Sequence, residues 1–233
     1  MSGRKEDDQK KDQYRWLAPF YEPLASIVFG QALVKAHFDL LESGQSCLHK
    51  ARSIVWLGGG TGIILNELLH TAPYAQVTYV EPSVQMLKRA QAKLDPQFKD
   101  RIEWVNARHT WLYESNQRVR WSETKIDILL TAFVLDVLSE APLNTLIRWA
   151  KGHVSTWFYA DFIPQKKWDR RLFIQFMYLC FRICTSIEQR SLLNHQTLMC
   201  EQGWHLIPGS QRRRAKQFVV SALYTLKGGS AHQ

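Results

Sequence analysis

The chain has 233 residues, of which 45% are hydrophobic and 12% aromatic, enough for one globular domain with a substantial core. A net charge of +9 is compatible with nucleic acid, an anionic membrane surface or an acidic ligand. Nucleic-acid binding is not expected, because the sequence has no nucleic-acid motif and no groove-like repeat of basic and aromatic residues. The basic cluster at Arg212, Arg213, Arg214 and Lys216 instead supports a subsidiary hypothesis, peripheral contact with an anionic membrane.

Cysteine use and the first residues favour a cytoplasmic protein. The four cysteines include no Cys-x-x-Cys pair of the kind that binds metal, so no metal site is expected. Residues 1–13 are polar and charged and lack the apolar core of a signal peptide, which predicts a disordered arm. The most apolar run, 172–187, is interrupted by polar residues and is too short to span a bilayer.

Helices come first in the chain, and strands then alternate with helices. After an aromatic segment at 14–21, apolar residues at helical spacing continue up to Gly44, where a helix is expected to stop. The alternation begins at residue 53 and predicts a parallel sheet with helices on both faces. Strands are expected at 54–57, 76–80, 101–105, 126–130 and 154–159, with helices at 61–70, at 84–94 and between Pro142 and Gly152.

The pattern changes after residue 164. Residues 165–200 have helical spacing without a strand, which predicts a helical insert over the ligand end of the sheet. Strands at 204–207 and 218–226, joined by a basic loop, predict an antiparallel hairpin at one sheet edge. The prediction is one α/β domain over 14–227, made of N-terminal helices (14–50), a cofactor-binding core (53–164), the insert (165–200) and the hairpin (203–227), with a tail at 228–233.

The most informative motif is the glycine run after the first strand. Gly58, Gly59, Gly60 and Gly62 lie between an apolar strand and a helical pattern. Because glycine has no Cβ and tolerates positive φ, such a turn lets a ligand approach bare backbone. The helix that follows offers free N–H groups and a positive dipole end. The motif therefore predicts the cofactor-binding corner of an α/β sheet.

Two further polar features end the neighbouring strands. Glu81 follows the second strand, where a carboxylate can accept hydrogen bonds from the two hydroxyls of a ribose. Asn106 and Ala107 follow the third strand, a suitable position for the edge of an adenine. The carboxyl ends of parallel strands form the ligand crevice of such sheets, so we expect these residues to share one site.

The glycine spacing separates two classes of adenosine cofactor. The dinucleotide fingerprint requires a third glycine where Ile63 or Leu65 stands, whereas Gly-x-Gly-x-Gly over 58–62 fits enzymes that use S-adenosylmethionine. The chain resembles the class I S-adenosylmethionine-dependent methyltransferases and is similar to their small-molecule branch around the ubiquinone/menaquinone C-methyltransferases. The resemblance rests on segments 16–21, 57–62 and 80–83, on Met86-Leu87, and on 127–130 running into 133–135.

The resemblance implies a Rossmann-like, seven-stranded methyltransferase sheet and S-adenosylmethionine as cofactor. The glycine turn would line the methionine and ribose side, Glu81 would hold the ribose hydroxyls, and Phe133 would lie near the methionine part. The other implied cofactor-binding residues are Gly58, Gly60, Thr61 and Gly62 in the turn, Pro82 and Ser83 beside the adenine, and Tyr14 and Tyr21, which would close over the site.

Two positions depart from the family pattern. Trp56 stands where an acidic residue usually precedes the glycines, which weakens the expected contact with the cofactor ammonium. Arg108, or Asn106, stands where an Asp usually meets the adenine amine; an Asn carbonyl could accept that hydrogen bond, whereas Arg could not. The alternatives are therefore a non-catalytic protein that binds an adenosine cofactor and a nicotinamide-dependent reductase on a similar sheet.

Methyl transfer needs a protein base only if the acceptor still carries its proton. The candidates are Asp136, Asp161 and His195. Asp136 is equally compatible with capping a helix that begins near Ser139. Asp161 fits slightly better as a solvated loop residue, and His195 as a polar surface or cap residue.

The predicted insert supplies the candidate acceptor pocket. Phe173, Phe176 and Met177 give its first helix apolar bulk, and Arg182 needs a partner or an anionic ligand group. Because the insert follows the fifth strand, it would cover the carboxyl ends of the sheet. These side chains indicate a small apolar or aromatic acceptor, and oxygen, nitrogen and carbon acceptors all remain open.

Overall fold

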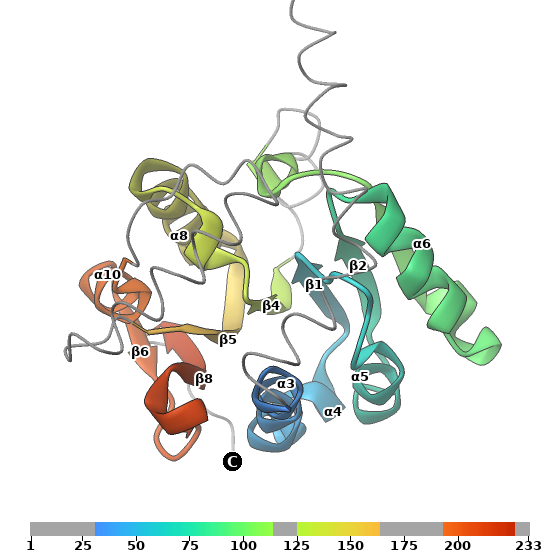
Figure 1. The fold of residues 1–233 in the computed structure, drawn as a ribbon, viewed down its shortest axis with the longest axis horizontal. Helices are drawn as coiled ribbons and strands as arrows, with labels where there is room; N and C mark the ends of the chain where they lie inside the picture. The colour runs from blue at the N-terminus through green and yellow to red at the C-terminus, as the bar shows by residue number, and fades with distance from the viewer. Residues whose placement is uncertain (1–30, 114–124, 164–192, 227–233) are drawn as a thin grey trace, which may run out of the picture.

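A computed structural model describes residues 31–113, 125–163 and 193–226 (Figure 1). Its sheet has eight strands in the order β3-β2-β1-β4-β5-β8-β6, with β7 paired to β8. The strands are β1 (Ser53–Leu57), β2 (Gln76–Val80), β3 (Ile102–Val105), β4 (Ile126–Ala132), β5 (Val154–Phe162), β6 (Trp204–Leu206), β7 (Arg212–Arg214) and β8 (Val219–Leu226).

The sheet is parallel from β3 to β5 and antiparallel at its closing edge. β1 pairs in parallel with β2 and β4, and β4 pairs in parallel with β5. β8 runs antiparallel to β5 and to β6, so the last long strand is inserted between them. The predicted α/β sheet with a closing antiparallel hairpin is confirmed.

Helices cover both faces of this sheet (Figure 1). Alternate residues of β1 divide the core: Ile54 and Trp56 pack toward α3, α4, α5 and α6, whereas Val55 and Leu57 pack toward α8 and α10. The helices are α3 (Ala32–Ser43), α4 (Gln45–Lys50), α5 (Leu65–Thr71), α6 (Val84–Lys93), α8 (Glu140–His153) and α10 (His195–Glu201), with short 3-10 turns η2 (Pro96–Arg101), η3 (His109–Tyr113), η4 (Leu135–Val137) and η5 (Ala215–Gln217).

Two predicted helix boundaries are wrong. The helix expected from residue 61 begins at Leu65, because Gly62 has a φ of +68°, a left-handed value that a right-handed helix cannot contain. Residues 58–62 instead form a longer turn, in which the Gly62 N–H donates to the Gly59 carbonyl at 3.2 Å. Gly152, expected just past the end of α8, lies inside its last turn.

The prediction of a basic loop before the last strand is also wrong in part. Part of this segment forms a strand, which brings the sheet to eight strands where seven were expected. Residues 212–214 form β7 on β8. The Arg214 guanidinium donates to both carboxylate oxygens of Asp39, at 2.6 and 2.9 Å, and Asp39 is only 3% exposed on α3. This bidentate pair ties α3 to the sheet edge, a contact that local sequence does not show.

The predicted arm, the tail and most of the predicted insert lie outside the described residues, and the domain limits stay predictions. Of the insert, only residues from 193 onward are described, and they contain α10. Within 31–113, 125–163 and 193–226, no helix combines the length and apolar character needed to cross a membrane.

Candidate functional site

The glycine turn is shaped by its neighbours on one side and open on the other. Gly58, Gly60 and Gly62 all have positive φ, between +60° and +68°. A Cβ on Gly58 would overlap Val134, and one on Gly59 would overlap the ring of Tyr79. Within the described residues, a Cβ on Gly60 would meet no atom within 4 Å. A ligand can therefore approach the turn at Gly60, beside which Thr61 is buried.

Tyr79 holds the glycine turn in place through a hydrogen bond to Gly60, a role that no sequence pattern indicated. Its hydroxyl donates to the Gly60 carbonyl at 3.0 Å. Its fully buried ring lies between Trp56 and Trp104, with ring centroids 5.2 and 5.0 Å away. Burial, and then the charge of Glu81, raises the pKa of Tyr79, so the hydroxyl remains a donor.

Glu81 joins the glycine turn to the start of α6. Its Oε2 accepts from the Gly60 N–H at 2.8 Å, and its Oε1 accepts from the Ser83 N–H at 2.8 Å. The side chain is 5% exposed, and burial raises its pKa while the two N–H groups lower it. Each carboxylate oxygen keeps a second lone pair, so the two oxygens can accept hydrogen bonds from two neighbouring hydroxyls such as those of a ribose.

The predicted adenine side is braced by Asn106. Its Nδ2 donates to the carbonyls of Glu81 and Pro82, both at 2.9 Å, which leaves its own carbonyl oxygen as the acceptor. Ser83 is the N-cap of α6 and accepts from the Met86 N–H at 3.3 Å. Ala107 follows Asn106 and is half-buried. Asn106 is thus fixed beside Glu81.

Phe133 lies just past β4 in a strained conformation. Its φ is +57°, and its N–H donates to the Ala160 carbonyl at 2.8 Å. Its ring packs on Phe162 at 5.3 Å and on His37 of α3 at 5.4 Å between centroids. Left-handed non-glycine residues are uncommon and cluster at functional sites. Sequence reasoning missed His37, which lies among the apolar residues of α3.

The three candidate bases lie together at the carboxyl ends of β4 and β5. The Asp161 Oδ2 accepts from the N–H groups of Leu135 at 3.0 Å and Asp136 at 3.3 Å, and its Oδ1 accepts from the N–H of Phe162 at 2.8 Å. The His195 Nδ1 lies 3.8 Å from the Asp161 Oδ2. The three residues therefore form one acid–histidine cluster: Asp136, Asp161 and His195.

Burial controls the charges in the acid–histidine cluster. Asp161 is 0% exposed, and burial and then the charge of Asp136 raise its pKa well above its usual value, against the opposing effect of three N–H donors. Burial lowers the pKa of His195 to about 4. The Tyr159 hydroxyl and the His195 Nδ1 are 3.3 Å apart. His195 is therefore neutral at neutral pH.

The structure contradicts the alternative interpretations of Asp161 and His195 as solvent-exposed residues. Asp161 and His195 are buried, at 0% and 1% exposure, and neither is a solvated loop or surface residue. Ser139, not Asp136, occupies the N-cap position of α8, and its side chain makes no capping hydrogen bond. The other predicted site residues, Tyr14, Tyr21, Phe173, Phe176, Met177 and Arg182, lie outside the described residues.

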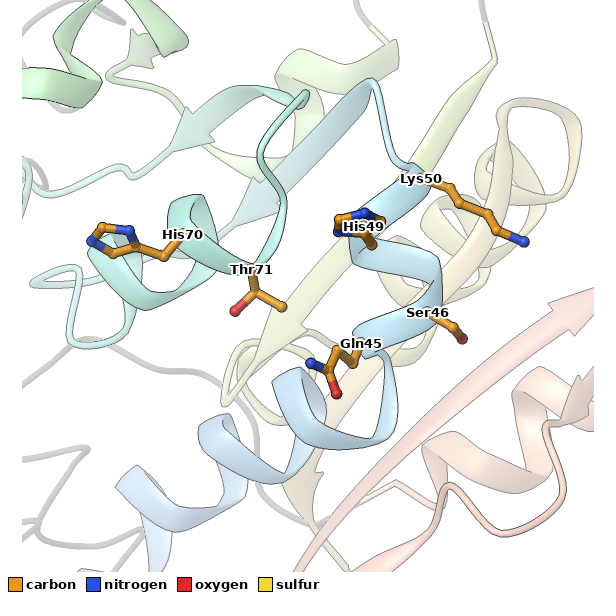
Figure 2. A pocket seen from close by; sticks show the side chains of 6 residues that line it. All are labelled: Gln45, Ser46, His49, Lys50, His70 and Thr71. Carbon is orange, nitrogen blue, oxygen red and sulfur yellow. The ribbon is translucent and has the colours of Figure 1, made fainter.

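A separate surface pocket lies between α4 and α5 (Figure 2). It is lined by both ends of the short helix α4 and by the last residues of α5. Each helix leads into the amino end of a strand, so the pocket faces away from the carboxyl-end crevice. Basic side chains near the C-terminus of a helix interact favourably with its dipole, which accounts for their position here without a bound ligand. The lining residues are Gln45, Ser46, His49, Lys50, His70 and Thr71.

The comparisons with known proteins agree with this fold. Residues 55–154 match a family model described as a methyltransferase domain. No curated protein sequence matches the chain. The fold is similar to that of an O-methyltransferase family protein from Burkholderia thailandensis, at 13% identity and a TM-score of 0.63, covering 86% of this chain and 58% of that one.

Two further solved structures have the same fold. A putative methyltransferase from Thermobifida fusca is 12% identical with a TM-score of 0.63, covering 88% of this chain and 86% of that one. Human N-acetylserotonin methyltransferase in complex with S-adenosylmethionine is 12% identical with a TM-score of 0.52, covering 81% of this chain and 50% of that one. This chain therefore has the Rossmann-like methyltransferase fold, and it spans 58% of the Burkholderia protein and 50% of the human protein.

Proposed function

We propose that this chain transfers the methyl group of S-adenosylmethionine to a small apolar or aromatic acceptor by in-line displacement. A methyltransferase domain over residues 55–154 implies this cofactor. The single observation that carries the proposal is the Glu81 carboxylate, held by the N–H groups of Gly60 and Ser83 at 2.8 Å each. It stands at the carboxyl ends of adjacent parallel strands, where sheets of this kind bind their ligands.

The residues at this corner fit an adenosine group. The remaining lone pairs of Glu81 suit two ribose hydroxyls. Gly60 leaves the space beside it open for close approach. The Asn106 side chain keeps a carbonyl oxygen that can accept from an adenine amine, since its Nδ2 already donates to backbone.

The cofactor supplies a methyl carbon activated by a positively charged sulfur, which leaves orientation and exclusion of water to the protein. Phe133 and Phe162 present aromatic rings at the carboxyl ends of β4 and β5. Aromatic faces stabilise nearby cations. The rings of Phe133 and Phe162 are therefore suited to stabilise the positively charged sulfur of the cofactor.

For an acceptor that still carries a proton, we assign the base to Asp136 and positioning roles to Asp161 and His195. The Asp161 carboxylate already accepts from three N–H groups, so it holds the loop after β4 in place. Neutral His195 packs against Tyr159, and its Nδ1 lies 3.8 Å from the Asp161 Oδ2, the oxygen that also binds the loop. Asp136, 7% exposed, is the least buried member of the acid–histidine cluster.

The proposal assigns the acceptor pocket to the predicted insert, with Phe173, Phe176 and Met177 as apolar wall and Arg182 as anchor for an anionic group. The resemblance to the ubiquinone/menaquinone C-methyltransferases makes a quinol-type carbon acceptor the first compound to try, followed by simple phenols. Both are flat and apolar, as the wall requires.

The first test is calorimetric titration with S-adenosylhomocysteine, the product form of the cofactor. The chain should bind it, and E81Q should lose at least tenfold in affinity, because hydrogen bonds from the ribose to a charged group are removed. E67Q changes an exposed Glu on α5 and should bind like the parent. No binding at high micromolar concentration would refute the proposal, and heat on titration with NADH would favour the reductase.

A further inference from the structure

Two polar atoms beside the glycine turn have no protein partner in the part of the chain that the structure describes. The Trp56 Nε1–H is buried without an acceptor, and Trp56 is 0% exposed. His37 of α3 has its Nδ1 bonded to the Leu33 carbonyl at 2.8 Å, and no hydrogen bond reaches its Nε2. The two rings lie 6.4 Å apart between centroids.

The two atoms have opposite hydrogen-bonding character. Since the Leu33 oxygen can only accept, the His37 Nδ1 carries the proton and Nε2 is left with a lone pair. Burial lowers the pKa of His37, which keeps the ring neutral. The indole of Trp56 can only donate. An orphaned buried donor costs free energy in the free protein, and a ligand acceptor recovers that cost.

Trp56 and His37 lie where the family pattern places the amino-acid end of the cofactor. Trp56 lies two residues before Gly58, where the family pattern has an acid for the cofactor ammonium. Tyr79, which packs against Trp56, already donates to the Gly60 carbonyl at 3.0 Å. Phe133, in the loop after β4, also packs against His37, with ring centroids 5.4 Å apart. The pair thus lies between the glycine turn and the loop after β4.

We propose that Trp56 and His37 together form the subsite for the α-amino-acid end of the cofactor, in place of the missing acid. The Trp56 Nε1–H donates to the carboxylate, and the His37 Nε2 accepts from the ammonium. A zwitterion carries one accepting and one donating group, which matches the two unsatisfied atoms. This assignment rests on the proposed function, because it names how that same cofactor is held.

A bound water molecule could also satisfy both atoms, and a pair of ligands separates the two cases. S-adenosylhomocysteine carries the amino-acid group, and 5′-methylthioadenosine lacks it while keeping the adenosine and sulfur. Calorimetry should give the affinity of each ligand for the parent chain and for W56F and H37F, which keep a ring and remove the polar atom. W204F is the matched control, since Trp204 is also 0% exposed with an unpartnered Nε1, on the opposite face.

We expect W56F and H37F each to lower the affinity for S-adenosylhomocysteine about tenfold, the effect of one charge-assisted hydrogen bond, and to leave that for 5′-methylthioadenosine unchanged. W204F should change neither affinity. An unchanged ratio of the two affinities in either W56F or H37F overturns the paired assignment, whether both affinities are kept or both fall together. Should W56F fail to fold, the ratio in H37F decides. If the parent chain binds neither ligand, the proposed function itself has failed.

Discussion

Substitution of Gly60 by Ala separates folding from ligand binding at the glycine turn. A Cβ at this position meets no atom of 31–113, 125–163 or 193–226 within 4 Å, so it clashes with no part of the described fold. The remaining cost is conformational, because Gly60 has a φ of +60° and a left-handed alanine costs about 1–2 kcal/mol. For a chain of this size, that lowers the melting temperature by roughly 2–8 °C.

The same Cβ occupies the side from which the proposed ligand approaches. We therefore expect G60A to lower the affinity for S-adenosylhomocysteine by more than tenfold in calorimetry, well beyond its modest effect on stability. Gly209 offers a matched control, since its φ is +76° and a Cβ there also meets no atom within 4 Å in the part of the chain that the structure describes. G209A should lose similar stability and keep full affinity. Parental affinity in G60A would show that no ligand lies against this turn.

Three further outcomes follow from single contacts. Y79F should lower the melting temperature by a few degrees, because the Gly60 carbonyl loses a buried hydrogen-bond donor worth about 1–2 kcal/mol. Y74F, at a position 57% exposed, is the control and should leave the melting temperature unchanged. Equal melting temperatures for the two variants would contradict the hydrogen bond from Tyr79 to Gly60. G152A should raise the melting temperature by roughly 2–4 °C, because glycine in the last turn of α8 costs about 1 kcal/mol relative to alanine and a Cβ there meets no described atom within 4 Å. A decrease would contradict this account of Gly152. The pKa of His195 is about 4 in the folded chain and 6.5 for a solvated histidine, so the unfolded chain binds more protons between those values. Urea unfolding should therefore show the parent losing stability relative to H195N as the pH falls from 6.5 to 4, and a constant difference would contradict the buried neutral histidine.

Sequence patterns were sufficient for the sheet because its strands are local features. Apolar runs such as 54–57 and 76–80 form strands at the predicted places. The errors arise where distant contacts or backbone strain decide. β7 depends on the ion pair between Arg214 and Asp39, which are 175 residues apart. The late start of α5 depends on the left-handed Gly62, whose conformation the glycine itself permits but does not require.

The site was predictable where function determines residue type, and unpredictable where packing does. Glu81 was placed at the candidate site because a carboxylate at that strand end can bind a diol; the structure shows its contacts with Gly60 and Ser83, and its role stays a prediction. Tyr79 and His37 were missed, because an aromatic in a strand and a histidine on a helix are ordinary core residues until their partners are known. Only the fold brings the Tyr79 hydroxyl to Gly60 and the His37 ring to Phe133.

Alternate residues of β5 face two chemically different regions at the ligand end of the sheet, one aromatic and one acidic. Ala160 and Phe162 face the side of α3, where the aromatic rings gather, whereas Tyr159 lies on the side of α8, where its hydroxyl meets His195 and the acid–histidine cluster is formed. The loop after β4 contributes to both, since Phe133 packs on Phe162 and the N–H groups two and three residues later bind Asp161. The strained φ of Phe133 is what turns the chain from one side to the other. A sulfonium held by the aromatic side would therefore meet an acceptor whose proton leaves on the acidic side, with one short loop setting the distance between them.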